Sequence, residues 1–428
     1  MFECSKCHEI SPEFSMKCNK CEQMFTMSEM SSYRRISGVE KPMPLSEVKM
    51  STHTRIPGLP EIDRILGGGI VAGSAVLIGG EPGIGKSTLI LQMCGQLEVN
   101  VLYVSAEESV YQSKLRAERL GISNELIKIV SEPNVSVLCK FIKELDIKVV
   151  VIDSIQAVYT DNVASSPGSP NQVKESASEL VDFCRHSNVA LILVGHITKD
   201  DNLAGPKSLQ HLVDTVLYFE GDMMQYRVLR CVKNRFGATD ETAIFKMTKC
   251  GLKEIEDSAE FISATPSNEI GTAICPAIIG SRLFMVEIQS LISKTAGNPV
   301  RRINGLDTNR VNMIIAVMER VMGLSLYSFD VYINVVAGIH IEEPAADLSV
   351  AMSLLSSLKN KALPAQSAYA GEIGLTGEIR PVPNIELRIK EAEKLKFGHI
   401  VVPANNKVDE RDGIIVLSRL VEVLEMVV

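Results

Sequence analysis

The segment from Gly80 to Ser87 constrains this chain more than any other stretch of its sequence. It reads Gly-Glu-Pro-Gly-Ile-Gly-Lys-Ser, which fits the G-x-x-x-x-G-K-S/T pattern of a phosphate-binding loop. The apolar run Ala75–Ile78 precedes it as a buried parallel strand should, and Ser87–Leu97 follows it with the apolar spacing of a helix. A loop that joins strand to helix in this way presents backbone N–H groups to an anion. We therefore predict a nucleoside triphosphatase core.

The residues of this loop have predicted parts in binding ATP and Mg²⁺. Glycines let the backbone curl around phosphate oxygens, Lys86 reaches the β- and γ-phosphates, and the Ser87 hydroxyl holds Mg²⁺. The alternative is a glycine-rich turn with an accidental lysine, which the flanking strand and helix disfavour. The predicted cofactor-binding residues are Gly80, Glu81, Pro82, Gly83, Ile84, Gly85, Lys86, Ser87, Thr88 and His196.

The composition limits the class of protein. The chain has 428 residues, which predicts two or three domains, and its 46% hydrophobic and 22% charged residues are ordinary for a globular fold. A net charge of -8 argues against coating nucleic acid with the whole surface, so any such binding needs a local basic lining. The N-terminus shows no signal sequence, and no apolar run approaches the ~20 residues of a membrane span. We expect a cytoplasmic protein without a membrane partner.

Four of the ten cysteines are bunched at the N-terminus in two Cys-x-x-Cys pairs, and the others are scattered singly, as in a reducing compartment. Four thiolates can close a tetrahedral Zn²⁺ shell with no open position, which predicts a structural zinc site. A segment of about 25 residues cannot bury its own core, so the metal would supply its folding free energy. The alternatives are a redox motif and chance clustering. The predicted zinc ligands are Cys4, Cys7, Cys18 and Cys21.

Two acidic residues follow apolar strands farther along the chain. Val101–Ser105 reads as a strand that leads into Glu107, and Lys148–Ile152 reads as a strand closed by Asp153. The carboxyl ends of parallel strands face the ligand side of an α/β sheet. We therefore predict that Asp153 partners Mg²⁺ and that Glu107 orients or deprotonates the attacking water. A lone acid at a strand end is usually a turn former, but two in succession after a phosphate loop favour catalysis.

A third apolar strand, Ala190–Gly195, ends in His196. A polar residue at that point can contact the γ-phosphate and report hydrolysis to the loop that follows. A structural histidine is the alternative. The polar loops expected on this side of the sheet are Thr160–Gln172 and Thr198–Lys207, and function often lies in such loops.

The pentapeptide Lys-Asn-Arg-Phe-Gly follows the expected strand Tyr226–Val232. Two cations one residue apart on an extended segment point the same way and could clamp phosphate, including that of a neighbouring subunit, as arginine fingers do. A basic turn is the alternative. The residues of this motif are Lys233, Asn234, Arg235, Phe236 and Gly237.

From about Pro266 the pattern changes to α+β with a core of its own. The expected strands include Leu283–Ser290 and Val331–Val336, and the expected helices are Asn309–Met322, Ala346–Leu358 and Ile385–Phe397.

Together these motifs resemble the RadA (Sms) family of bacterial recombination and repair ATPases along essentially the whole chain. The features that carry the resemblance are the cysteine pairs, Gly80–Ser87, Lys233–Gly237, Gly280-Ser281-Arg282 and Val286–Gln289. The resemblance implies an α/β, RecA-like P-loop ATPase core between an N-terminal four-cysteine zinc finger and a C-terminal α+β Lon-protease-like domain. The expected boundaries are 1–27 for the finger, 28–50 for a linker, 51–265 for the ATPase domain and 266–428 for the Lon-like domain. One departure from the family is that this chain has no tryptophan, a residue that the family's finger commonly carries. The sequence therefore does not indicate which surface of the finger binds a partner.

The resemblance also implies roles. It makes Glu107 the water-activating glutamate and places Lys233 and Arg235 in trans across the interface of a hexameric ring. Such a ring would translocate on single-stranded DNA and promote branch migration of branched intermediates with a RecA-type recombinase. The predicted catalytic residues are Lys86, Glu107, Asp153, Lys233 and Arg235. The predicted DNA contacts are Lys199, Lys207, Arg282, Arg301, Arg302 and Arg310, although surface arginines are mostly solvated charge.

The Lon-like half is expected to lack peptidase activity. In the best register its serine position is Asp347 and its lysine position is Arg388, and neither can serve as nucleophile or base. Ser349 and Lys390 lie two places further on and therefore on different helix faces. This disfavours an ATP-dependent protease. The remaining rival is a regulatory, circadian-clock-like ATPase that binds proteins instead of DNA, and the finger and Lon-like half argue against it.

Overall fold

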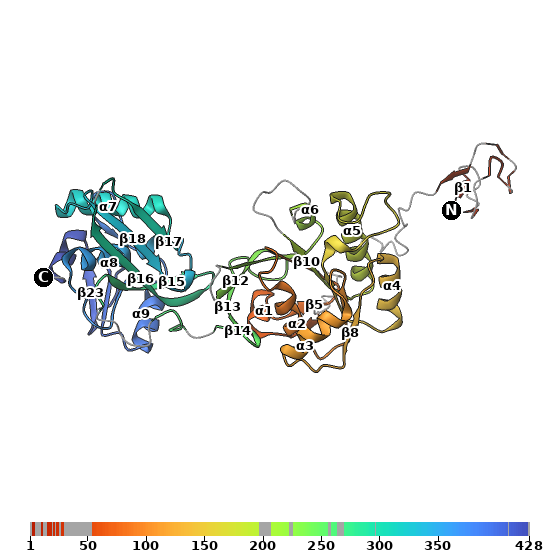
Figure 1. Ribbon diagram of the computed structural model, residues 1–428, viewed down its shortest axis with the longest axis horizontal. Helices are drawn as coiled ribbons and strands as arrows, with labels where there is room; N and C mark the ends of the chain where they lie inside the picture. Colours follow the sequence, from red (N-terminus) through yellow and green to blue (C-terminus); the bar gives the residue numbers. More distant parts are fainter. Residues whose placement is uncertain are drawn as a thin grey trace, which may run out of the picture. The chain divides into compact units, whose positions relative to one another are not determined.

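The computed structural model describes residues 2–4, 10–11, 15–18, 20–21, 23–24, 27–29, 54–196, 207–221, 226–255, 258–262, 269–295, 297–409 and 411–426 (Figure 1). Contacts divide the chain into two units, Met1–Thr52 and His53–Val428. The expected border between ATPase and Lon-like domains at 265/266 falls in a segment outside the described residues, so it stays a prediction.

The first unit contains a small antiparallel sheet. Its strands are β1 (Phe2–Cys4), β2 (Ile10–Ser11) and β3 (Met27–Glu29), in the order β2-β1-β3. The sheet therefore runs past the expected end of the finger at residue 27. Cys18 is buried, and its backbone N–H donates to the carbonyl of Gln23 at 3.0 Å.

The predicted zinc ligands are only partly covered by this description. Cys4 lies in β1, Cys18 and Cys21 flank a turn, and Cys7 lies outside the described residues. Within the described part of the chain, no three His, Cys, Asp or Glu side chains gather as a metal site. The zinc site therefore stays a prediction.

The second unit begins with a nine-stranded sheet in the order β14-β13-β12-β11-β6-β10-β9-β7-β8. The parallel strands are β6 (Ala75–Gly80), β7 (Val101–Ser105), β8 (Ile127–Val130), β9 (Val149–Asp153), β10 (Ala190–His196) and β11 (Thr215–Gly221). Antiparallel strands β12 (Tyr226–Asn234), β13 (Thr242–Thr248) and β14 (Gly251–Glu254) extend one edge. This confirms the predicted α/β P-loop core.

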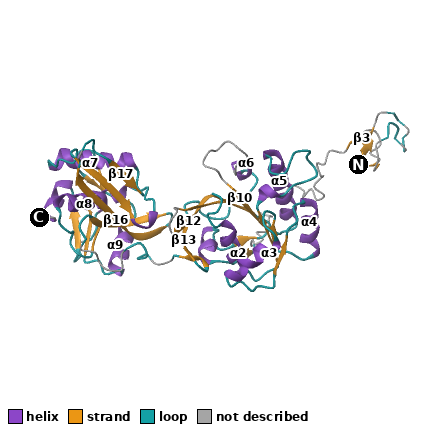
Figure 2. Cartoon of the chain, viewed as in Figure 1, coloured by secondary structure: helices purple, strands orange, loops and turns teal. Residues whose placement is uncertain are grey.

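Helices cover both faces of this sheet (Figure 2). Because strand side chains alternate between faces, Val76 and Ile78 of β6 pack in one core with α2, whereas Ala75 and Leu77 pack in another with α4 and α5. The helices are α1 (Pro60–Ile65), α2 (Lys86–Gln96), α3 (Val110–Arg119), α4 (Val135–Glu144), α5 (Pro170–His186) and α6 (Lys207–Gln210). The short strands β4 (Arg55–Ile56) and β5 (Ile70–Val71) pair beside α1.

The C-terminal half carries a seven-stranded sheet in the order β17-β18-β16-β15-β19-β22-β23. Its strands are β15 (Thr272–Ile279), β16 (Arg282–Lys294), β17 (Arg301–Asn304), β18 (Phe329–Val335), β19 (Ser367–Tyr369), β22 (His399–Pro403) and β23 (Ile414–Leu417). Helices α7 (Thr308–Met322) and α8 (Asp347–Lys359) share one core, and α9 (Ile385–Lys394) packs in another. Strands β20 (Glu372–Ile373) and β21 (Ile379–Arg380) form a separate hairpin.

The C-terminal core draws in residues from the ATPase half. Ile244 of β13 is buried in the same cluster as Phe284 and Val286 of β16. The ring of Phe261 packs edge-on against Tyr226 at 5.2 Å and against Phe284 at 5.3 Å between centroids. The two halves of this unit therefore share one stretch of apolar core.

The apolar periodicity locates most of the elements correctly. The strand expected at Val101–Ser105 agrees with β7. The helix expected at Asn309–Met322 agrees with α7 to within one residue. The helix expected to end at Phe397 ends three residues earlier, because Lys396 adopts a left-handed φ of 63°. No helix among the described residues is long and apolar enough to cross a bilayer.

Candidate active site

The phosphate-binding loop joins the end of β6 to the start of α2. Gly85 caps α2 with a φ of 114°, which favours glycine, so the first N–H groups of the helix open toward the loop. Gly80 passes close to the neighbouring strand β11, since a Cβ there would lie 2.3 Å from the carbonyl oxygen of Phe219. The loop is thus shaped by backbone geometry that only these glycines allow, and it forms an anion-binding helix terminus.

Lys86 lies folded over this loop and is only 4% exposed. Its ammonium donates to the carbonyl oxygens of Gly80 and Glu81, each at 2.8 Å, and faces Nδ1 of His196 at 3.2 Å. Burial lowers the pKa of Lys86, and the nearby carboxylates of β9 and of the turn after β7 oppose that shift. A cation held at this point suits the charge of a phosphate.

His196 bridges Lys86 and Glu107. An ammonium can only donate, so Nδ1 of His196 accepts and Nε2 carries the ring proton. Nε2 lies 3.2 Å and 3.3 Å from the two carboxylate oxygens of Glu107, to which Ser154 also donates through its hydroxyl. A movement of Lys86 toward a phosphate would therefore change the hydrogen bonding of His196, and through it the hydrogen bonding of Glu107.

The turn that carries Glu107 is fixed by the start of α3. Ser109 caps that helix by accepting from the backbone of Gln112, whose side chain in turn accepts from the backbone of Ser109. Glu108 points away to an ion pair with Arg116 at 2.6 Å. Of the two adjacent glutamates, Glu107 is the one that contacts His196 and Ser154, and its role in activating water stays a prediction.

Asp153 ends β9 beside Glu107, in the position expected for a magnesium partner. The hydroxyl of Tyr103 donates to Oδ2 of Asp153 at 2.6 Å. Burial, and after it the charge of Asp153, holds the pKa of Tyr103 well above its usual range, so the phenol stays a donor. The Ser87 hydroxyl and the Asp153 carboxylate are the hard oxygen donors that Mg²⁺ prefers, so these residues fit the ion.

The two cations of the Lys-Asn-Arg-Phe-Gly motif both contact the short segment from Gln210 to Asp214. The ammonium of Lys233 donates to the carbonyls of Gln210 and Val213, both at 2.7 Å. Arg235, 57% exposed, pairs with the buried carboxylate of Asp214 at 3.0 Å. Within the chain, both cations therefore hold the segment between α6 and β11.

The other residues of the motif build the turn. Asn234 accepts from the N–H of Phe236 at 2.9 Å and donates to the carbonyl of Ile65 at 3.1 Å. Gly237 leaves no room for a side chain, since a Cβ there would lie 2.8 Å from Nδ2 of Asn234. Arg55 donates to the carbonyl of Phe236 at 3.1 Å. The motif is therefore fastened to the segment around α1.

The predicted DNA contacts fall into different environments. Lys199 lies outside the described residues, and Lys207 begins α6. Arg282 pairs with the buried Glu61 of α1 at 2.9 Å, and Arg310 holds the carboxylate of Asp347 through paired hydrogen bonds. Both of these arginines are thus engaged in ion pairs within the chain.

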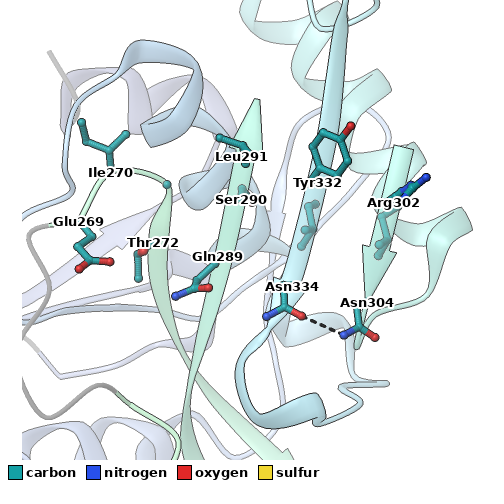
Figure 3. A pocket seen from close by; sticks show the side chains of 13 residues that line it. Glu269, Ile270, Thr272, Gln289, Ser290, Leu291, Arg302, Asn304, Tyr332 and Asn334 are labelled. Atoms are coloured by element: carbon teal, nitrogen blue, oxygen red, sulfur yellow. Dashed lines mark hydrogen bonds between the residues drawn. The ribbon is translucent and has the colours of Figure 1, made fainter. Parts of the chain in front are cut away.

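Arg301 and Arg302 lie on the edge strand β17. Arg301 donates to the side chain of Asn312 at 2.9 Å, whereas Arg302 is exposed and lines a groove of about 520 Å³. Figure 3 shows Arg302 beside Tyr332, with a hydrogen bond of 2.9 Å between Asn304 and Asn334. Gln289, Leu291 and Thr272 continue this groove across the sheet.

The two positions that correspond to a Lon-type serine and lysine are locked in ion pairs. Asp347, 2% exposed, accepts from Arg310 and from the backbone N–H of Ile373. Arg388 is fully buried and donates to both carboxylate oxygens of Glu343, at 2.8 Å and 2.5 Å. Ser349 donates to the carbonyl of Tyr369, and Lys390 is exposed.

Several site residues carried no signal in the sequence. Tyr103, which donates to Asp153, reads in the sequence only as a member of an apolar strand. Ser154, which donates to Glu107, reads only as part of the turn after the strand that ends in Asp153. Asp214 precedes β11, where its carboxylate also accepts from the N–H of Ala75, at 3.0 Å. An acid at the start of an apolar strand was the one available hint. Glu343 offered none, because its partner Arg388 lies 45 residues away.

Comparison with known proteins gives matches to both halves. A family model described as an AAA domain matches residues 41–202, and one described as subunit ChlI of Mg-chelatase matches residues 294–406. The chain is 43% identical to DNA repair protein RadA of Bacillus subtilis, over 95% of this chain and 92% of that protein. It is 42% identical to the proteins of that name from Chlamydia muridarum and Haemophilus influenzae, over 94% of this chain in both cases and over 91% and 92% of those proteins.

Among solved structures, a KaiC-like protein from Pyrococcus horikoshii matches with a TM-score of 0.40 and 20% identity, over 47% of this chain and 99% of that one.

Proposed function

The chain belongs to the RadA family of DNA repair proteins, and we propose that it is a DNA-stimulated ATPase acting in homologous recombination and repair. The observation that carries this proposal is the hydrogen-bonded chain from Lys86 through His196 to Glu107, at the sheet edge where β9 ends in Asp153. Ligands of open α/β sheets bind at that edge. The protein would work in the cytoplasm.

The proposed chemistry follows from these side chains. Lys86 would leave its loop carbonyls for the β- and γ-phosphates of ATP, where it stabilises the charge that develops on transfer. Glu107 would orient and deprotonate the attacking water, and His196 would report whether Lys86 is engaged. Mg²⁺, held by Ser87 and through Asp153, would supply further charge neutralisation on the phosphates.

We further propose that the protein forms a hexameric ring that moves on single-stranded DNA and promotes branch migration of branched intermediates with a RecA-type recombinase. The family supports this proposal, and so does the groove on the C-terminal sheet. There Arg302 offers charge for phosphate, Tyr332 a stacking surface, and Asn304 and Gln289 hydrogen-bonding groups for bases. The buried ion pairs at Asp347 and Arg388 support a domain without peptidase activity.

The test is the rate of ATP hydrolysis with and without single-stranded DNA, run beside an assay of fork unwinding. We expect DNA to raise the rate in the wild type and to leave Lys86→Ala inactive. A basal rate that no form of DNA changes would contradict the proposal and favour a regulatory ATPase that binds proteins.

The trans role of Lys233 and Arg235 is tested by mixing subunits. Lys233→Ala and Lys86→Ala each spoil a different part of a composite site, so a mixed ring would contain some sites with both residues intact. We expect partial recovery of ATPase activity in the mixture. If co-assembly is proven and the mixture stays as inactive as its components, the motif acts only within its own chain, through Asp214 and the carbonyls near it.

We also propose that Cys4, Cys7, Cys18 and Cys21 bind one structural Zn²⁺, which the two Cys-x-x-Cys spacings and the burial of Cys18 support. Elemental analysis should give about one Zn²⁺ per chain, and Cys18→Ser should lower that content. Purified wild-type protein that is folded in this segment and free of zinc would contradict the site.

A further inference from the structure

We infer that Tyr103 is a positioning residue for the divalent cation of the ATPase site, acting through Asp153. This inference rests on the proposed function, because it concerns the cation that accompanies ATP. The observation that carries it is the hydrogen bond of 2.6 Å from the Tyr103 hydroxyl to Oδ2 of Asp153.

The fold sets this contact rigidly. Strand β7 runs parallel to β9, with Tyr103 beside Val151 and Ser105 beside Asp153, so the phenol ring extends two residues along the sheet to reach the carboxylate. Tyr103 is 0% exposed and packs in the core that contains Leu91 and Cys94 of α2. The ring therefore lies between the strand that ends in Asp153 and the helix that begins beside Ser87.

The contact selects one oxygen of Asp153 for the cation. A phenol has one proton to donate, and Tyr103 gives it to Oδ2. No other side chain in the described part of the chain is seen to donate to this carboxylate, so Oδ1 would be the oxygen left for the cation. An aspartate has a broad torsion at its carboxyl group. Tyr103 removes that freedom and so orients the ligand before the cation arrives.

Loss of such an outer partner typically weakens metal binding by about 10- to 100-fold. We therefore expect Tyr103→Phe, which removes only the hydroxyl, to weaken Mn²⁺ binding to the complex with ATPγS by about 10-fold, measured by electron paramagnetic resonance. Affinity for ATPγS in EDTA should stay unchanged. Turnover at low Mg²⁺ should fall, and saturating Mg²⁺ should restore the maximal rate, which a merely structural role would not produce.

The matched control is Tyr369→Phe. Tyr369 is also fully buried, and its hydroxyl bonds to that of Ser367 at 2.7 Å in the C-terminal half. Its removal should cost similar stability in thermal unfolding but leave Mn²⁺ binding at the wild-type value. In an Asp153→Asn background, Tyr103→Phe should have little further effect, because coupled residues are not additive.

Wild-type Mn²⁺ affinity in Tyr103→Phe would overturn the inference and leave the proposed ATPase intact. An equal loss in Tyr369→Phe, or a full additional loss in the Asp153→Asn background, would also overturn it. A wild-type protein that binds neither ATPγS nor Mn²⁺ would instead overturn the proposed function itself.

Discussion

Lys86→Ala is expected to lower the rate of ATP hydrolysis by at least about 10²- to 10³-fold, the range found when one donor to a transition-state oxyanion is removed. The physical reason is that the ammonium meets phosphate charge that grows during transfer. The fold should survive, because within the described residues the ammonium of Lys86 bonds to two loop carbonyls and to His196 and to no other group. Phosphate release under saturating ATP and Mg²⁺ measures the effect, and circular dichroism checks the fold.

Glu107→Gln provides the contrast to this variant. The amide keeps the size of the side chain and can still accept from Ser154, but it cannot take a proton from water. ATP binding should therefore persist while hydrolysis falls by about 10²- to 10⁴-fold, the usual contribution of a general base. Equal loss of binding would make Glu107 a structural residue, and wild-type turnover in Lys86→Ala would remove the phosphate loop from the mechanism.

Glu343→Leu is expected to lower the free energy of unfolding by about 3–5 kcal/mol, since removal of one partner of a buried ion pair leaves the other charge uncompensated. The stranded group would be Arg388, which is fully buried and donates to both oxygens of Glu343. Urea unfolding followed at a C-terminal reporter measures the loss. Asp146→Asn is the control, because its pair with Lys148 is exposed and worth less than about 1 kcal/mol.

A second substitution separates burial of charge from loss of packing. In Glu343→Leu combined with Arg388→Met, no charge is stranded, and stability should return to within about 1–2 kcal/mol of the wild type, as similar replacements elsewhere have been near neutral. If the double variant is as unstable as Glu343→Leu alone, lost packing or the lost hydrogen bonds to the backbone of Ile278, Pro276 and Pro383 decide the effect, and stranded charge does not. The affinity for ATP, measured in parallel, should be the same in both variants as in the wild type.

The ATPase core could be predicted from the sequence because its signals are local. The run Ala75–Ile78, the glycines after it and the apolar spacing of α2 all lie within a few turns of one another, and each restricts the backbone directly. Glu107 and Asp153 were found for the same reason, since strand ends in a parallel sheet converge on one edge. The C-terminal helices followed from periodicity in the same way, apart from the early end of α9 at Lys394.

The residues that hold this site in place could not be predicted, because their contacts join distant parts of the chain. Tyr103 and Asp153 are 50 residues apart, and Lys233 reaches the carbonyl of Val213 across 20 residues. A tyrosine inside an apolar strand is predicted to be a core residue. Its bond to Asp153 depends on the pairing of β7 with β9, which the sequence pattern does not reveal. Likewise, the arginines predicted as a DNA lining include Arg282, whose ion pair with Glu61 depends on packing that spacing does not encode.

The apolar core shared by β13 and β16 bears on how this chain can be dissected. Gln92 of α2 bonds through its side chain to both backbone groups of Leu252 in β14, and the adjoining β13 buries Ile244 in the C-terminal core. A fragment cut after the ATPase sheet would bare Ile244, and the complementary fragment would bare Phe261, which packs on Tyr226 of β12 in the intact chain. We therefore expect isolated halves to aggregate or to bind to each other. If nucleotide binding shifts α2, the shift would reach the C-terminal sheet through Gln92, β14 and β13.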